Sequence, residues 1–256
     1  MTPTPRQWSN GLRPNLRPGH SFRLRLQLVS GLLIAGLLSA CGGGGGSYES
    51  GAPLPVAGQF PLEAAYKSLV AQGSSTDYTV SGTCSGTARL SYSVPVAGTL
   101  NGVQALVVSE TVATAYTNCS PASSLSTSQT FYDAMYNPVA TAAQGSVNGT
   151  VVTTPAGLPS LVVVGDQGTF ATETLYSDSS LRVVVGRIQL DYVISADTDS
   201  SVLATLVSRA FDAANQLVLT QQTVYRLGTD GSFTALAIDL QYSTTSNTHL
   251  VFTRQL

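Results

Sequence analysis

The sequence has few charged residues and few of the side chains that most metal, redox and nucleic-acid sites need. Only 10% of the residues are charged, and there are two histidines, three cysteines and one tryptophan. Lys67 is the only lysine. Because nucleic-acid binding requires clustered lysine and arginine, this shortage argues against a nucleic-acid partner. The scarcity of histidine and cysteine argues against a transition-metal site, so we predict no metal and no other cofactor.

The sequence also lacks an apolar run of about 20 residues, the length that a membrane-spanning helix needs. A shorter run lies near the N-terminus. Residues 1–25 contain five arginines and no acidic residue, and residues 26–38 are apolar apart from Gln27, Ser30 and two glycines. A basic segment, a short apolar core and small residues before a cleavage point are typical of an export signal. We therefore predict that residues 1–40 are a signal peptide.

The segment Leu38-Ser39-Ala40-Cys41 resembles the lipobox of bacterial lipoproteins. In a lipobox the cysteine thiol receives a diacylglyceryl group, and cleavage then makes that cysteine the N-terminal residue. The resemblance implies lipidation at Cys41 and attachment to a membrane through the lipid, since two or more acyl chains give stable anchoring. Residue 42 is Gly rather than Asp, which favours the outer membrane over the inner membrane. The alternative is an ordinary cleaved signal in which Cys41 is incidental.

Cleavage before Cys41 would leave an acidic chain that begins with a tether. It would remove five of the twelve basic residues and none of the fourteen acidic ones, so the formal net charge would move from −2 to −7. Residues 41–59 are rich in glycine, proline and serine, beginning with the run Gly42–Gly46. Such a composition buries too little apolar surface to fold, so we predict a flexible tether followed by a folded domain over residues 60–256.

Two cysteines, Cys84 and Cys119, remain after Cys41. An even pair in an oxidising compartment predicts a disulfide. The alternative is a redox-active pair, but the two cysteines are far apart and form no Cys-x-x-Cys motif. A structural disulfide is therefore the better interpretation.

The folded domain is predicted to be mainly β with one N-terminal α-helix. Residues 61–72 place apolar side chains at Leu62, Ala65, Tyr66, Leu69 and Val70, which is the spacing of one helical face. After Asp77 the apolar period changes to two, as in strands. The predicted strands are 78–83, 87–93, 103–117, 127–136, 145–153, 161–164, 169–177, 187–194, 202–212, 217–227, 233–240 and 249–254.

Short connections and the absence of helical crossovers predict antiparallel meander sheets, either a sandwich or an open half-barrel. The dipeptide Asp230-Gly231 between two strands predicts a hairpin turn. A faint repeat, in which Gly86-Thr87 and Gly168-Thr169 introduce similar strand patterns, raises the alternative of two β-units that join near residues 153–159.

No catalytic set emerges from the motifs. Gly82-Thr83-Cys84-Ser85-Gly86 has the spacing of a nucleophile elbow, but a strand rather than a helix is predicted after it. His249, the one histidine after residue 41, is predicted to face solvent, and spacing assigns it no carboxylate partner. Asp197 and Asp199 alternate like calcium ligands but lack the glycine and distal glutamate of an EF-hand, so a turn is preferred. We therefore predict no enzymatic activity, and a hydrolase with a dispersed site that uses His249 is the least favoured alternative.

The runs Tyr78–Ala88 and Thr117–Pro121, together with the lipobox cysteine and glycine run, resemble a group of uncharacterised proteobacterial lipoproteins. The resemblance implies anchoring in the cell envelope and assigns no ligand. The first hypothesis is a non-catalytic envelope protein with a structural role or a protein partner. The alternative is a periplasmic carrier of a hydrophobic ligand, such as a lipid or a lipoprotein, with the helix against a curved sheet. A cavity enclosed by that sheet would favour the carrier.

Overall fold

A computed structural model describes residues 58–100, 102–143, 149–155, 157–177, 181–243 and 248–256. The predicted signal peptide, Cys41 and all but the last two residues of the predicted tether lie outside these ranges. The domain is mainly β, antiparallel throughout, with one helix among the described residues, as the sequence predicts. Within these ranges no helix is long and apolar enough to cross a membrane.

The described chain consists of one helix followed by thirteen strands. They are α1 (Leu62–Gln72), β1 (Ser74–Gly82), β2 (Gly86–Tyr92), β3 (Val96–Leu100), β4 (Val103–Tyr116), β5 (Ser123–Tyr132), β6 (Pro138–Ala143), β7 (Gly149–Pro155), β8 (Gln167–Tyr176), β9 (Val184–Thr198), β10 (Ser201–Asp212), β11 (Leu217–Gly228), β12 (Phe233–Tyr242) and β13 (His249–Arg254).

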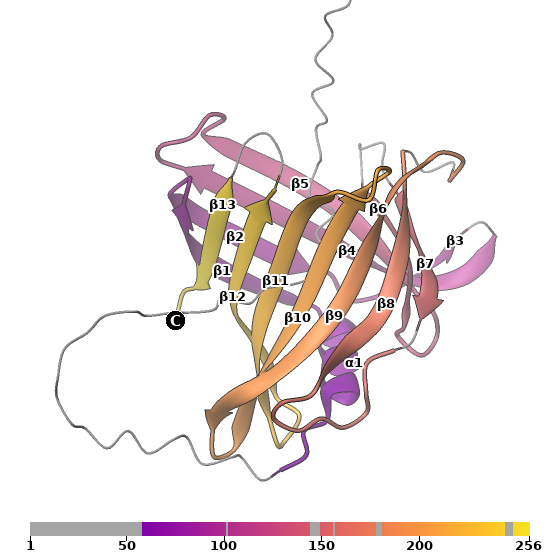
Figure 1. The fold of residues 1–256 in the computed structure, drawn as a ribbon, viewed down its shortest axis with the longest axis vertical. Coiled ribbons are helices and arrows are strands. Elements are labelled where there is room, and N and C mark those ends of the chain that lie inside the picture. The colour runs from indigo at the N-terminus through magenta and orange to yellow at the C-terminus, as the bar shows by residue number, and fades with distance from the viewer. Residues whose placement is uncertain (1–57, 101, 144–148, 156, 178–180, 244–247) are drawn as a thin grey trace, which may run out of the picture.

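All thirteen strands belong to one barrel-like sheet (Figure 1). From β4 to β13 each strand pairs with the next one along the chain. The strand β2 pairs with β1 on one side and with β4 on the other, while the short β3 continues along the same edge of β4. The first and last strands, β1 and β13, also pair, from Tyr78 with Arg254 to Gly82 with Leu250. The strand pairings therefore form a ring, which goes beyond the open half-barrel expected from the meander.

The ring has an apolar inner face and a polar outer face. In β9, for example, Ile188, Leu190 and Ile194 are buried inside, while Gln189 and Arg187 lie on the outside. Ion pairs lie on the outer face and include Arg89 with Asp77, Arg209 with Asp191 and Arg226 with Asp197. This alternation is the period-two pattern of a sheet that is solvated on one side only.

The helix α1 lies within the ring toward one of its ends, and Figure 1 shows it behind β8 and β9. Pro61 precedes its first turn and Gly73 ends it with a φ of 65°, which a side chain would oppose. Leu62 and Ala65 are buried in the same apolar core as the inward residues of β9 to β13. Phe60, just before the helix, forms an isolated β-bridge to Val162. The predicted helix is confirmed, and it fills part of the interior.

The strand predictions are confirmed for most of the ring, with three exceptions. The strands β3 and β6 were not predicted, because Gly98 interrupts the first and Pro138 begins the second. Glycine and proline both lower the propensity for strand. The predicted strand at 161–164 is reduced to the single bridge between Val162 and Phe60. The Asp230-Gly231 turn is confirmed, since the Gly228 amide donates to the Ser232 carbonyl at 2.9 Å across it.

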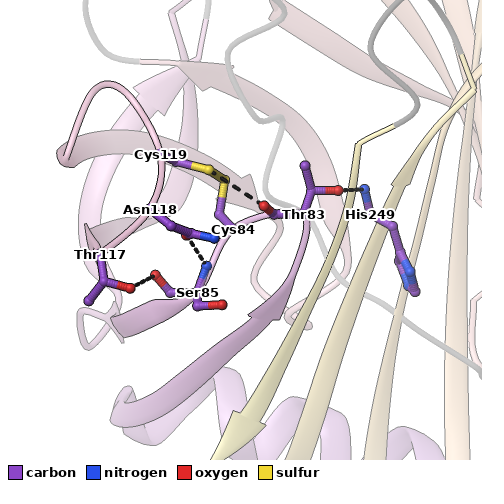
Figure 2. Close-up of a disulfide and its surroundings, with 7 residues drawn as sticks. All are labelled: Thr83, Cys84, Ser85, Thr117, Asn118, Cys119 and His249. Atoms are coloured by element: carbon purple, nitrogen blue, oxygen red, sulfur yellow. Dashed lines mark hydrogen bonds between the residues drawn. A yellow bond between two sulfur atoms is a disulfide. The ribbon is translucent and has the colours of Figure 1, made fainter.

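The predicted disulfide between Cys84 and Cys119 is present, at the end of the ring away from α1 (Figure 2). It joins the β1–β2 turn to the β4–β5 loop, and the Ser85 amide donates to Asn118 Oδ1 at 2.7 Å beside it. The Thr83 amide donates to the His249 carbonyl at 2.7 Å, at the start of β13. The disulfide therefore reinforces the rim next to the place where the first and last strands meet.

Candidate functional site

The interior of the ring contains a partly open cavity of about 390 Å³ between two groups of strands. One wall is made by β1, β2 and β4, and the other by β11, β12 and β13, with Leu69 of α1 between them. The lining residues are Leu69, Ser74, Ser75, Thr76, Tyr78, Ala88, Leu90, Tyr92, Glu110, Val112, Thr114, Tyr116, Gln221, Thr223, Tyr225, Phe233, Thr234, Ala235, Ile238, Leu240, Tyr242, Leu250, Phe252 and Arg254. Apolar and aromatic side chains dominate, and the volume lies in the range of small-molecule sites.

Aromatic side chains organise the walls of this cavity. Tyr225 of β11 stacks on Phe233 of β12, with ring centroids 4.2 Å apart and planes 9° from parallel. Tyr78 of β1 meets Phe252 of β13 edge to face, with centroids 6.5 Å apart. Each pair joins neighbouring strands, so the sheet holds these rings in place in the cavity wall.

Several inward side chains keep accessible surface although they lie inside the ring. Leu90, Val112 and Tyr242 are all half-buried, and each lines the cavity. On β9 and β10, by contrast, the inward side chains Ile194 and Leu206 are almost completely buried. The accessible surface of the first group faces the cavity, so this side of the interior is hollow rather than closely packed.

Glu110 of β4 places a carboxyl group on the inner face of the ring. Only 3% of it is exposed, and in the strand register it lies opposite Tyr92 on one side and Ser128 on the other. It lines the large cavity and also a smaller one of about 50 Å³, whose walls include Tyr66, Tyr132 and a second buried glutamate, Glu173. Buried carboxylates are costly to place in a fold, so two of them beside voids that share Glu110 as a lining residue mark a polar centre inside an apolar ring.

The tyrosines around this centre remain neutral phenols at physiological pH. Burial raises the pKa of Tyr92 and of Tyr225 well above 10.0, and the charge of Glu110 raises both further. Burial is also the main cause of the raised pKa of Tyr132, and the nearby Tyr66 raises that pKa further. Burial raises the pKa of Tyr242 to about 12. These groups can donate hydrogen bonds or present their ring faces to a ligand, but they do not ionise near neutral pH.

A second hollow, of about 520 Å³, lies between α1 and the β5–β6 turn. Its charged groups are already held within the protein. Lys67 Nζ donates to Glu63 Oε1 at 2.7 Å, and Asp133 Oδ1 accepts from the amides of Met135 and Asn137 at 2.8 and 2.9 Å. The charged groups of this hollow therefore stabilise the helix and the β5–β6 turn.

Within the described residues, no group of three or more potential metal-binding side chains comes together. Asp197 is held by Arg226 and Ser201, with distances from its Oδ2 of 2.6 Å to Arg226 Nε and 2.6 Å to Ser201 Oγ. The hydrogen bonds from Arg226 are the main cause of its lowered pKa. The Asp197–Asp199 segment thus lies beside an ion pair at the β9–β10 turn.

His249 faces outward as predicted, and it has a carboxylate partner that spacing did not reveal. Its Nε2 lies 2.8 Å from Asp239 Oδ1 of the neighbouring strand β12. Half of the His249 side chain is exposed, and the pair lies on the outer face of the ring. Figure 2 shows Thr83 between His249 and the disulfide, with the His249 backbone amide donating to Thr83 Oγ1. Cys84 is bonded to Cys119, so it offers no thiolate to this pair.

Comparisons with known proteins leave this site to be interpreted from its own geometry. No family model matches the chain, and neither the curated proteins nor the solved structures include a match.

Sequence reasoning missed Glu110 as a site residue although the strand that carries it was predicted. The signal was its position: Leu106, Val108 and Val112 occupy the apolar face of β4, and Glu110 falls in the same alternation. Glu173 interrupts the apolar face of β8 in the same way, between Ala171 and Leu175. A carboxylate at an inward position is the exception worth noting in an otherwise regular strand.

Proposed function

We propose that this protein is a lipid-anchored cell-envelope protein that binds a small, largely apolar ligand inside its β-domain. The observation that carries this proposal is the cavity of about 390 Å³, walled by aromatic and aliphatic side chains from β1, β2 and β4 and from β11, β12 and β13. The role is that of a non-catalytic carrier or receptor. Attachment through Cys41, with the outer membrane as the preferred site, belongs to the same proposal and rests on the lipobox.

The geometry favours ligand binding over a purely structural role. A structural domain gains stability by filling its core, because empty space inside a protein forfeits packing contacts. Here the inward side chains Leu90 and Val112 face open volume, while other inward side chains of the same ring are completely buried. A hollow of this size with fixed aromatic walls is the arrangement that small-molecule sites use.

The test is binding of a neutral fluorescent hydrophobic probe, N-phenyl-1-naphthylamine, to the full chain in lipid nanodiscs, with empty nanodiscs as the blank. Ala235→Trp places a large ring at the cavity wall and is expected to weaken probe binding at least about tenfold. Ala115→Trp, on the exposed outer face of β4, is the matched control and should leave binding unchanged. Circular dichroism checks that both variants fold. Equal probe binding by the two variants would show that the cavity is not the site.

Native mass spectrometry of protein released gently from the envelope gives an independent measurement. The carrier proposal expects a bound molecule of small mass that is lost in Ala235→Trp. A role in binding another envelope protein instead expects no small adduct and a partner chain that is recovered equally well with both tryptophan variants.

A further inference from the structure

We propose that the cavity selects a ligand with one cationic group, an amine or a quaternary ammonium, carried on an apolar body, and that Glu110 is the residue that recognises the cation. This inference rests on the proposed ligand-binding function and specifies the class of ligand. Three features of the interior support it: the place of Glu110, the aromatic rings around it and the apolar volume beside it.

Glu110 brings a negative charge to the cavity wall from a strand whose backbone is fixed on both sides. It pairs in register with Tyr92 of β2 and with Ser128 of β5. Because neighbours on both edges hold the β4 backbone, the Glu110 side chain is kept on the inner face of the sheet, where it borders both voids. A buried carboxylate at a cavity wall suits a ligand that carries hydrogen-bond donors and positive charge.

Aromatic rings lie close enough to Glu110 for its charge to affect them. Tyr92 and Tyr225 both line the same cavity, and Tyr92 also lines the smaller one that Glu110 borders. A cation in this place would meet the faces or edges of phenol rings as well as the carboxylate. Cation–π attraction is strongest where water is excluded, and cages of aromatic rings are the usual site for quaternary ammonium groups.

The rest of the cavity suits the body of such a ligand. Leu90 and Val112 on one wall face Ile238, Leu240 and Leu250 on the other wall, and none of these side chains is charged. Arg254, the cationic side chain in the lining, donates from Nη1 to the Ala235 carbonyl at 3.3 Å, near the end of β13. The formal net charge of −7 for residues 41–256 would also draw cations rather than anions toward the domain.

The test compares three ligands that share one chain length and differ in charge: octylamine, octanol and octanoate. Each is titrated against the full chain in lipid nanodiscs by calorimetry, and empty nanodiscs give the background. The expected result is that octylamine binds at least about tenfold more tightly than octanol, and that octanoate binds more weakly than octanol.

Glu110→Gln keeps the shape of the side chain and removes its charge, so the amine and the alcohol should then bind within about twofold of each other. Asp239→Asn removes a negative charge from the outer face of β12 and should leave the tenfold preference intact. If Glu110→Gln does not fold by circular dichroism, Tyr92→Leu serves instead, and its preference for octylamine should fall at least about threefold.

The outcomes separate this inference from the proposal on which it rests. Equal binding of all three ligands to the unmodified chain, abolished by Ala235→Trp, would overturn the charge selection and leave ligand binding in place. Tighter binding of octanoate, or a preference for octylamine that survives Glu110→Gln, would also overturn it. Absence of binding by all three ligands would defeat both.

Discussion

The two sides of the ring interior differ in how closely their side chains pack. On β9 and β10 the inward residues Ile194, Val202 and Leu206 are between 0 and 2% exposed, and Phe60 and Leu62 share their apolar core. On β2, β4 and β12 the inward residues Leu90, Val112 and Tyr242 border open space. One helix does not fill a ring of this size, so the filled side supplies more of the packing and the hollow side keeps the cavity in which we propose that a ligand binds.

The first prediction compares a leucine from each side. Leu206→Ala should destabilise the domain by about 2–5 kcal/mol, because it empties a site that is completely buried. Leu90→Ala should cost only about 1 kcal/mol, since Leu90 already faces the cavity and loses fewer contacts. Equilibrium unfolding in urea measures both variants. Equal losses at the two positions would mean that the hollow side is packed after all.

The second prediction concerns the rim of the hollow side. Replacing both Cys84 and Cys119 by serine should lower stability by about 2–4 kcal/mol, because the disulfide spans 35 residues and restricts the unfolded chain. Hydrogen exchange should then accelerate most in β1 and β2, which meet beside the disulfide, and least in β9 and β10. A uniform increase along the chain would contradict a local role for the bond.

The third prediction concerns the loss of stability at alkaline pH. The pKa of Tyr242 is raised from 10.0 to about 12, chiefly by burial and further by Tyr116, so the folded protein holds this proton more tightly than the unfolded chain does. This proton contributes roughly 2–3 kcal/mol to the free energy of unfolding below pH 10, and the contribution is lost as the pH rises toward 12. Tyr242→Phe should show a shallower loss over the same interval. Parallel curves for the two proteins would exclude Tyr242 as the cause.

The smallest effect is expected on the outer face, where neither side of the interior is disturbed. Asp197→Asn removes the carboxylate that pairs with Arg226 and should cost about 1 kcal/mol or less at neutral pH. The pKa of Asp197 is lowered from 3.8 in the folded state. The difference in stability between the variant and the unmodified protein should therefore shrink as the pH falls below 3.8, and disappear below the lowered pKa of the folded state. Thermal unfolding at several pH values measures it, and a larger loss would show that this ion pair supports the β9–β10 turn.

The sequence predicted the walls of the ring but not its closure. Alternation located most strands because each has one solvated face, and the Asp230-Gly231 turn and the α1 stripe were equally local signals. The pairing of β1 with β13 joins residues at opposite ends of the domain, and no local pattern encodes that contact. The strands β3 and β6 were missed because Gly98 and Pro138 lower strand propensity, whereas their pairing partners supply the missing stability.

The cavity could not be predicted for a related reason. An inward leucine at a filled position and one at a hollow position look alike in sequence, as Leu206 and Leu90 do. What separates them is where the helix lies within the ring. The pairing of Asp239 with His249 was also beyond spacing arguments, because the two residues lie on neighbouring strands rather than close together in the chain. The inward position of Glu110 could be read from the alternation of β4, but the cavity beside it could not.

The contact between β1 and β13 has a consequence for how the chain folds. The edge of β1 that faces β13 stays open until the last strand has been synthesised, because its partner residues begin at Leu250. Until then the nascent chain exposes a row of unpaired amides and carbonyls, which other polypeptides could join. Folding should therefore be slow and completed only by the whole chain, and removal of the last few residues should lead to aggregation rather than to a smaller stable domain.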